Sequence, residues 1–253
     1  MAACLRGRCG HIEVTFDQAE FSVRCEWGLR GLRELAPVSD VVIVVDVLSF
    51  TTALDIATSR GATVLPYPLK DESAAEYAAS VHADLACRRG GSGFSLSPAS
   101  LLNVPAGYRL VLPSPNGAAL CFAVDHPVVL AACLRNAAAV AETAARLGST
   151  VAVIPAGEQW NSGELRPCLE DWIGAGAVID ALPASRSPEA ELAVAAFWRF
   201  CSDLGGALQQ CSSGKELIER DFAADVELAA ELNVSRHVPR LVNRAFAGES
   251  LTV

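Results

Sequence analysis

The feature that most constrains this chain is a regular alternation between short β-branched, apolar runs and longer alanine-rich stretches. The apolar runs cover residues 12–16, 41–47, 63–66, 110–113, 128–131 and 151–154. Alanine-rich stretches of helical character follow at about 51–59, 72–81, 118–124, 136–147 and 170–181, and residues 189–231 are expected to be all helical. Continuous apolar runs are typical of strands that helices cover on both faces. The alternation therefore predicts an α/β layer fold with a largely buried sheet.

The length of 253 residues predicts one globular domain that spans residues 1–253. The strand–turn–helix unit recurs often enough to suggest two related halves, and residues 238–246 are expected to add a last strand. Two loops, residues 88–105 and 155–167, are rich in glycine or proline. Loops of that length inside a compact domain are usually functional or mobile.

The charge and cysteine content narrow the class of partner. Twenty Lys and Arg against 29 Asp and Glu leave a net charge of −9, which argues against nucleic-acid binding but leaves small anionic substrates open. No apolar run reaches the roughly 18 residues of a membrane span, and residues 1–10 lack the apolar core of a signal peptide. Nine cysteines, an odd number without CxxC spacing, favour a cytoplasmic protein.

The candidate site lies where the predicted strands end, because open α/β sheets bind ligands there, beside helix N-termini. Asp46 follows the most apolar run, and a carboxylate at the end of a buried strand needs a metal, a cation or amide donors to compensate it. Helix capping is the alternative role for Asp46. Thr51 and Thr52 follow it, either as caps or as substrate ligands.

Two further strand ends carry polar residues into a helix. Ser114, Asn116 and Gly117 form a turn whose amides would point toward a following helix, an arrangement that binds phosphate. Turns also use Asn-Gly for backbone reasons alone. Arg135 and Asn136 end the next strand, where the arginine either meets an anion or extends along the surface.

The fourth strand end introduces three more acids. Glu158 follows the strand at 151–154, and Glu170 and Asp171 open the helix expected at 170–181. Acids in a first helical turn often only complement the helix dipole. Together with Asp46, however, they form an oxygen-rich set of the kind that holds Mg²⁺.

Several common catalytic motifs are absent from the sequence. No cysteine is followed six positions later by arginine, and Asp46 lacks the second acid of an aspartyl-phosphate enzyme. There is no GxxxxGK[ST], GxGxxG, GxSxG or HExxH pattern, and the four histidines show no ligand spacing. These absences leave the strand-end acids as the main source of chemistry.

The motifs, taken in order, resemble the 2-phosphosulfolactate phosphatase family, the ComB proteins of coenzyme M biosynthesis. The resemblance runs through residues 46–53, 93–98, 114–117, 156–158 and 169–176, and continues at 213–218, Asp225, 232–235 and 238–239. It implies a three-layer α/β/α fold with a mostly buried mixed sheet. It also implies Mg²⁺-dependent hydrolysis of a phosphate monoester, (R)-2-phospho-3-sulfolactate, to 3-sulfolactate and phosphate.

The first motif departs from the family pattern. The family has Asp-Val-Leu-Arg with Ala-Thr-Thr, whereas Ser49 and Phe50 stand here in place of the arginine and alanine. An arginine fork is the natural partner of a carboxylate or sulfonate. Arg88 and Arg89 in the glycine-rich loop are candidates to supply the cation instead, although loop arginines are usually solvated.

These observations lead to one main hypothesis and two alternatives. The main hypothesis is a phosphatase in which Mg²⁺ is held by some of Asp46, Glu158, Glu170 and Asp171, with Asp46, Glu158 and Asp171 as the catalytic acids. The expected substrate-binding residues are Ser49, Thr51, Thr52, Arg88, Arg89, Ser114, Asn116, Gly117, Arg135 and Asn136. The alternatives are a phosphatase for another small phosphorylated acid or sugar, and a ligand-binding protein without turnover. The sequence leaves open whether the chain forms a homodimer.

Overall fold

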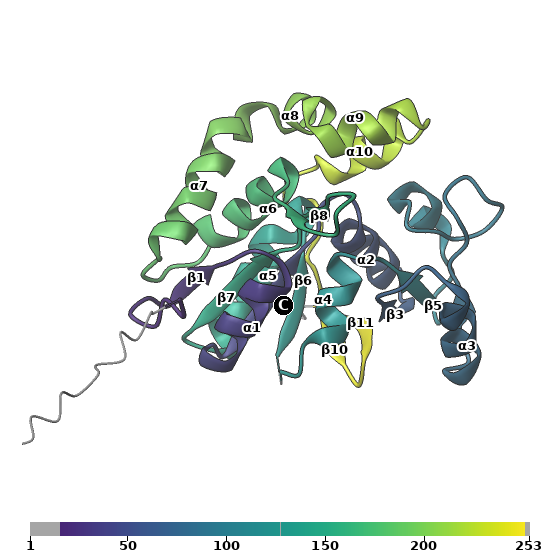
Figure 1. The fold of residues 1–253 in the computed structure, drawn as a ribbon, viewed down its shortest axis with the longest axis horizontal. Helices are drawn as coiled ribbons and strands as arrows, with labels where there is room; N and C mark the ends of the chain where they lie inside the picture. The colour runs from purple at the N-terminus through teal and green to yellow at the C-terminus, as the bar shows by residue number, and fades with distance from the viewer. Residues whose placement is uncertain (1–15, 127, 251–253) are drawn as a thin grey trace, which may run out of the picture.

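The computed structural model describes residues 16–126 and 128–250, with side chains described up to residue 247. It contains a nine-stranded mixed sheet with helices on both faces, which confirms the predicted three-layer α/β/α class (Figure 1). The strand expected at 12–16 lies outside the described residues except for Phe16, which is in a turn.

The nine-stranded sheet and a separate two-stranded sheet together contain eleven strands. They are β1 Val23–Cys25, β2 Val41–Val45, β3 Thr63–Tyr67, β4 Asp84–Leu85, β5 Arg109–Pro113, β6 Val129–Ala132, β7 Val151–Pro155, β8 Glu158–Gln159, β9 Leu165–Arg166, β10 His237–Val242 and β11 Ala245–Ser250. The order in the large sheet is β1-β7-β2-β6-β10-β11-β3-β5-β4, and β8 pairs separately with β9.

The described helices follow the strands as the sequence predicts, within one or two residues for most of them. They are α1 Gly28–Leu35, α2 Phe50–Ser59, α3 Glu72–Ser80, α4 Gly117–Ala123, α5 Ala137–Leu147, α6 Leu169–Asp180, α7 Pro188–Phe200, α8 Leu204–Gln210, α9 Ser212–Glu219 and α10 Ala223–Ala229. Short 3₁₀ turns lie at Ala36–Val38, Pro98–Asn103, Leu134–Asn136 and Cys201–Asp203. Helix α1 and the short strands β1, β4, β8 and β9 were not predicted from the sequence; α1 is amphipathic, with Leu32 and Leu35 buried, but is only eight residues long.

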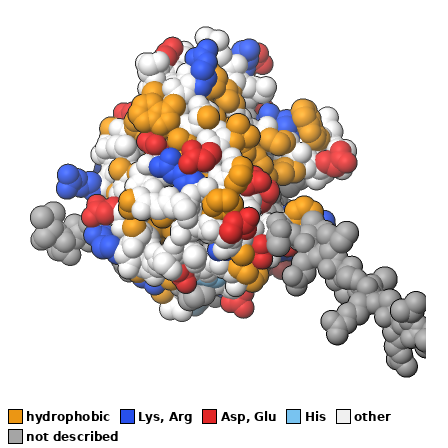
Figure 2. All heavy atoms as spheres, turned by 90° about the vertical axis from the view of Figure 1, so that its left-hand side faces the viewer, with side chains coloured by type: hydrophobic (Ala, Val, Ile, Leu, Met, Phe, Trp, Pro, Cys, Tyr) orange, Lys and Arg blue, Asp and Glu red, His pale blue; other side chains and the backbone are white. Residues whose placement is uncertain are grey.

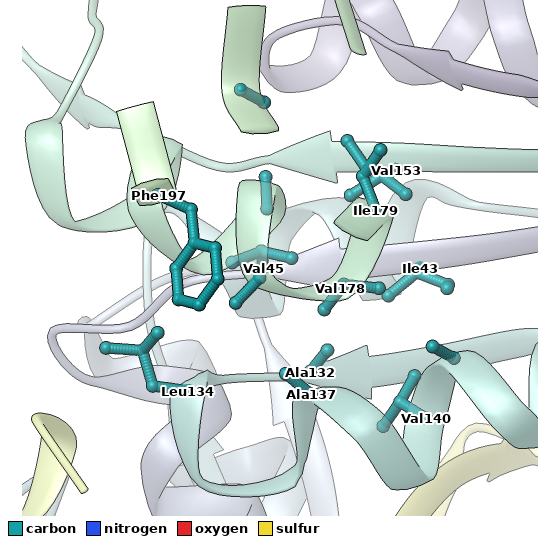
Figure 3. Close-up of a cluster of buried hydrophobic side chains, with 14 of the residues drawn as sticks. Ile43, Val45, Ala132, Leu134, Ala137, Val140, Val153, Val178, Ile179 and Phe197 are labelled. Carbon is teal, nitrogen blue, oxygen red and sulfur yellow. The ribbon is translucent and has the colours of Figure 1, made fainter. Parts of the chain in front are cut away.

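In β2, successive apolar side chains point to opposite faces of the sheet, which explains why the sheet is covered on both sides. Its residues Val41, Ile43 and Val45 belong to one hydrophobic core, and Val42 and Val44 belong to another. Successive strand residues point to opposite faces, so a strand without a polar position must be covered twice. In the first core, side chains of β2, β6 and β7 meet those of α5, α6 and α7 (Figure 3).

Helices from different parts of the chain cover the two faces. The second core is closed by apolar residues of α1, α2 and α4, while α5 and α6 cover the first, with α7 packed on α6. The last helices, α8 to α10, lie beside α6 and at the end of the sheet where β8 is found (Figure 1). This places α9 above the ends of the strands that carry the candidate site.

The sheet consists of two parallel blocks joined by an antiparallel hairpin. Strands β1, β7, β2 and β6 are parallel, as are β3, β5 and β4, and β10 with β11 lies between the blocks. The predicted last strand at 238–246 is thus a hairpin that spans residues 237–250. Its two strands run antiparallel to their neighbours β6 and β3.

The hairpin joins the two blocks through very short pairings. In the described chain, β10 meets β6 through one residue pair, Arg240 with Leu130, and β11 meets β3 through Phe246 with Val64. Three successive antiparallel pairings separate β6 from β3, so the two parallel blocks run in opposite directions. The segment after β5 nevertheless reaches the segment after β2, as described below.

The surface beside α7 and β1 mixes charged and hydrophobic side chains. Acidic, basic and apolar groups are interspersed on this face (Figure 2). In α7, the apolar side chains of Leu192 and Trp198 are exposed. Over the part of the chain that the structure describes, no helix has the length and hydropathy of a membrane span.

Candidate functional site

A polar pocket lies where strand ends of both parallel blocks meet. Its volume is about 160 Å³, and its walls come from the segments after β2 and β5, from β8, from the glycine-rich loop and from α9. We call it the reaction pocket. Its polar lining residues are Asp46, Ser49, Lys70, Arg89, Ser114, Asn116, Glu158, Ser213, Glu216 and Arg220.

Asp46 connects the two strand ends. Its Oδ1 accepts a hydrogen bond from the backbone N–H of Phe50 at 3.2 Å, and its Oδ2 accepts one from the N–H of Gly117 at 2.8 Å. The carboxylate thus meets the first residues of both α2 and α4, where helix amides lack internal partners. Burial, together with the charges of Glu158 and Glu170, raises the pKa of Asp46 to about 6 against these hydrogen bonds.

Gly117 is required for this close approach. A Cβ at this position would lie 2.6 Å from Asp46 Oδ2 and 2.7 Å from a ring carbon of Phe50. The sequence analysis expects the Gly117 amide to bind phosphate. In the structure that amide donates to the Asp46 carboxylate, which therefore occupies the anion site at the start of α4.

Asp171 joins the ends of β2 and β7 from inside the protein. Its Oδ1 accepts from the N–H of Val47 at 2.7 Å, and its Oδ2 accepts from the N–H of Gly157 at 2.8 Å. Burial, together with the charges of Asp46 and Glu170, raises the pKa of Asp171 well above its ordinary range. Asp171 lies outside the reaction pocket, so it holds the strand ends that carry the acids rather than facing a ligand.

Glu158 is the second acid of the reaction pocket. Its Oε1 accepts from the side-chain amide of Asn116 and from the backbone N–H of Gln159, each at 2.9 Å. Its Oε2 accepts no hydrogen bond from any described residue. One oxygen of Glu158 is therefore fixed in position and the other is available to a ligand.

Glu170, the remaining acid of the predicted set, is buried away from the pocket. Only 3% of the surface of Glu170 is exposed. Burial of the Cys211 thiol, together with the charge of Glu170, raises the pKa of that thiol to about 12. Among residues 16–126 and 128–250, no three acidic, histidine or cysteine side chains converge into a preformed metal cage. The structure therefore brings two of the four predicted metal ligands, Asp46 and Glu158, to one pocket.

Arg89 is the main cation of the reaction pocket. Its Nη2 donates to Ser49 Oγ at 2.8 Å, and its Nη1 forms an ion pair with the buried carboxylate of Asp225. Asp225 also accepts from the Ser97 hydroxyl at 2.5 Å and from the backbone N–H of Ala99 at 3.0 Å. The guanidinium thus lies beside the residue that replaces the family arginine.

Two cations of the pocket were missed by the sequence analysis. Lys70 lies between β3 and α3, and Arg220 follows α9. The only available signal was the rarity of lysine, since Lys70 and Lys215 are the two lysines in the chain. Arg88, which was predicted, lines a neighbouring cavity instead of this pocket.

The other predicted ligands lie elsewhere. The hydroxyls of Thr51 and Thr52 donate to the backbone carbonyls of Asp46 and Val47, at 2.7 and 2.8 Å. Arg135 is paired with Asp55 and Glu231. The Asn136 side chain, which is fully buried, accepts from the N–H of Cys133 at 2.9 Å and ties this loop to β10. Each of these groups bonds within the protein and lies outside the reaction pocket.

The fold and the pocket define an α/β protein in which carboxylates and cations face each other at the carboxyl ends of parallel strands. The chain belongs to the 2-phosphosulpholactate phosphatase family, whose profile matches residues 31–244. That match covers every polar residue of the reaction pocket.

Individual relatives agree with the family profile. The chain is 30% identical over 220 residues to a probable 2-phosphosulfolactate phosphatase of Gloeobacter violaceus, covering 82% of this chain and 91% of that protein. It is 32% identical over 205 residues to the 2-phosphosulfolactate phosphatase of Methanothermobacter thermautotrophicus, covering 79% and 86%. A probable 2-phosphosulfolactate phosphatase of Deinococcus radiodurans is 32% identical over 216 residues, covering 80% and 88%.

Proposed function

We propose that this protein is a Mg²⁺-dependent phosphatase that hydrolyses (R)-2-phospho-3-sulfolactate to 3-sulfolactate and phosphate. The observation that carries the proposal is the pocket in which the acids Asp46 and Glu158 face the cations Arg89 and Lys70. A site that only bound an anion would gain nothing from two nearby carboxylates. A site that hydrolyses a phosphate monoester uses both signs of charge. The names of the relatives support the substrate.

The donor set fits Mg²⁺. In sites of phosphoryl transfer this ion takes one or two carboxylates, several waters and substrate oxygens. Asp46 would hold the ion, and its repulsion from the neighbouring Glu158, which raises the pKa of Asp46 together with its burial, would be relieved by a cation. This leaves Oε2 of Glu158 free for proton transfer. When bound, Mg²⁺ supplies charge stabilisation for the phosphoryl oxygens and lowers the pKa of a bound water.

The cations of the pocket bind and orient the phosphoryl group. Arg89 presents a planar donor fork that is held on one side by Asp225 and on the other by Ser49. Such a fork matches phosphoryl oxygens, and because it is already positioned it costs little reorganisation during the reaction. Lys70 adds a second positive charge at the same pocket.

Glu158 acts as the general base. Its free Oε2 takes a proton from the attacking water while the water oxygen bonds to phosphorus and the phosphorus–ester oxygen bond breaks. The leaving alkoxide takes a proton from solvent, and Glu158 returns its own proton to solvent, which yields the hydroxy acid and inorganic phosphate. Asn116 holds the other oxygen of Glu158, so the base keeps its orientation.

Arg89 compensates for the arginine that the first motif lacks at position 49. Position 49 is a serine, and the Arg89 guanidinium hydrogen-bonds to that serine. The positive charge that the family motif provides is thereby supplied from the glycine-rich loop. This substitution supports retention of an acidic substrate.

The cysteines support the cytoplasmic location that we include in the proposal. The seven cysteines among the described residues are free thiols, and Cys25, Cys121, Cys133, Cys168 and Cys211 are buried. Free thiols in this number are typical of a reducing compartment.

The test is phosphate release by purified protein from 2-phospho-3-sulfolactate, 2-phospholactate, glycerol 2-phosphate and glucose 6-phosphate, with Mg²⁺ or with EDTA. We expect Mg²⁺-dependent release that is fastest from 2-phospho-3-sulfolactate. Glu158→Gln should lower kcat by a factor on the order of 10² to 10⁴, since it removes the base but keeps the shape. Full activity in EDTA would contradict the metal assignment, and no release from any of the four would contradict the function.

A further inference from the structure

A second cavity opens beside the reaction pocket. Its volume is about 610 Å³, against about 160 Å³ for the reaction pocket. We call it the side cavity. Four residues line both spaces, namely Lys70, Arg89, Leu96 and Arg220. The two cavities are thus neighbours along a shared wall, and a ligand anchored in one can reach the other.

The side cavity is strongly basic in an acidic protein. Its lining includes Lys70, Arg88, Arg89 and Arg220 but a single acid, Asp71, although the chain as a whole has a net charge of −9. Asp71 caps the start of α3, where its carboxylate accepts from the backbone N–H of Ser73 at 3.0 Å. Among the described residues of the cavity wall, the one acid therefore serves the helix and does not pair with the cations.

Two of these four cations lack a carboxylate partner. Among the side chains that the structure describes, no carboxylate lies within 4.0 Å of Lys70 or Arg88. Arg89 is paired with the buried Asp225, and Arg220 is paired with the exposed Glu216. Partial burial and repulsion from Arg89 lower the pKa of Lys70. Gathering unpaired positive charge costs free energy, which an anionic ligand would recover.

The rest of the cavity wall is apolar. Leu85, Leu96 and Pro113 contribute side chains, together with Ala74 and Ala86. A bare inorganic anion would have no use for such a wall. An acidic group carried on a short carbon skeleton matches both the cations and the apolar surface.

We propose that the side cavity binds a second acidic group of the substrate, a carboxylate or sulfonate whose carbon skeleton extends from the phosphate ester, and that Lys70 is the specificity-determining cation between the two groups. The inference rests on the proposed function, because it takes the phosphate ester to occupy the reaction pocket. Lys70 lies on the loop after β3 and lines both cavities, so it stands on the wall that they share.

The binding test uses the scarcity of lysine. Reductive methylation with ¹³C-formaldehyde keeps the positive charge and labels two side chains, Lys70 and Lys215, besides the α-amino group. Lys70→Arg and Lys215→Arg assign the signals. Titration with sulfoacetate, which carries a carboxylate and a sulfonate but no phosphate, should shift the Lys70 methyl signal in a saturable manner and leave the Lys215 signal in place. Equal movement of both signals, or of neither, would overturn the proposal.

The kinetic test compares two substrates that differ by one acidic group. 2-Phospholactate and isopropyl phosphate have the same branched skeleton, and only the first carries a carboxylate. Lys70→Met should reduce the preference for 2-phospholactate in kcat/KM by about tenfold or more, mainly through KM, because a charged hydrogen-bonding partner of the ligand is lost. Lys215→Met removes the same charge from an exposed position of α9 and should keep the wild-type preference.

The two tests separate this inference from the proposed function. If the protein hydrolyses phosphate esters and Lys70→Met keeps the wild-type preference, the side-cavity proposal is wrong and the phosphatase stands. If no ester is hydrolysed, the NMR titration still decides whether Lys70 binds a carboxylate or sulfonate.

Discussion

Two arginine–aspartate pairs in this protein have nearly the same chemistry and different surroundings. In the pocket pair, Arg89 and Asp225 have 13% and 1% of their side-chain surface exposed. In the second pair, the values for Arg135 and Asp55 are 14% and 1%. Each aspartate also accepts a serine hydroxyl at 2.5 Å, from Ser97 in the first case and Ser235 in the second.

The two pairs differ in the other partners that each guanidinium has besides its aspartate. Arg135 uses Nε for Asp55 and Nη1 for Glu231 and for the carbonyl of Leu228, so it is surrounded by carboxylates and backbone. Arg89 meets one carboxylate and one hydroxyl, and it lines both the reaction pocket and the side cavity. Burial and ion pairing alone therefore do not identify an arginine that binds a ligand. The second partner of the guanidinium, a further carboxylate for Arg135 and a serine hydroxyl for Arg89, distinguishes the two.

The largest expected effect is on stability, and it is common to both pairs. Arg135→Met should lower the free energy of unfolding by about 3–5 kcal/mol, because it leaves the buried Asp55 carboxylate without its cation. Chemical denaturation measures the change. The double variant Asp55→Asn with Arg135→Met should recover part of the loss, since it removes the uncompensated charge. A double variant as unstable as the single one would show that packing rather than charge is at stake.

A slightly smaller effect is expected on catalysis at the pocket pair. Arg89→Met should lower kcat/KM for 2-phospho-3-sulfolactate by a factor on the order of 10² to 10³, the cost of losing one preorganised donor to developing negative charge. Activity is normalised to folded protein, because Asp225 loses its partner as well. Arg135→Met is the matched control and should keep kcat/KM within about threefold per folded molecule. Equal losses in the two variants would erase the distinction.

Asp46 differs from the two ion-paired aspartates, because no described arginine or lysine lies within 4.0 Å of it. Its effect on stability should therefore depend on pH. Its pKa is raised from an ordinary 3.8 to about 6, so the folded state holds the proton longer than the unfolded state. Stability from this group is therefore lost as the pH rises from about 4 through 6, by up to about 3 kcal/mol.

Asp46→Asn removes that titration. In EDTA, the stability of the wild type relative to this variant should fall across the same pH range, as measured by denaturation at each pH. Mg²⁺ at neutral pH should raise the melting temperature of the wild type and not that of the variant. A stability difference that does not depend on pH would contradict the raised pKa.

The smallest effect comes from the two serines. Ser97→Ala and Ser235→Ala each remove one hydroxyl from a buried carboxylate and should each lower stability by about 1–2 kcal/mol. Only Ser97→Ala should also raise KM, by a few-fold, because Asp225 positions Arg89. Thermal melts and steady-state rates on the same preparations measure both quantities. A KM increase in both variants, or in neither, would argue against a positioning role for Asp225.

Much of the fold was predictable from local patterns. The run at 41–47 has no polar residue before Asp46, and the structure buries both faces of β2, as such a run requires. The same reasoning placed Asp46, Ser114 and Glu158 at or just after strand ends. It did not distinguish Arg89 from Arg135, and it missed Lys70, because a lone cation in a loop has no periodicity that marks it.

The sequence by itself determined where most of the longer strands and helices form, that β2 is buried on both faces, and that acids follow β2 and β7, because these properties depend on the spacing of neighbouring residues. Only the tertiary structure decided which strand ends meet. Asp46, just after β2, meets Gly117 at the start of α4, although β2 and β5 belong to blocks that the hairpin β10–β11 separates. Asp225 meets Arg89 across 136 positions of the chain, where α10 packs against the 3₁₀ turn Pro98–Asn103. Contacts of that range follow from strand order and helix packing, which no local pattern encodes.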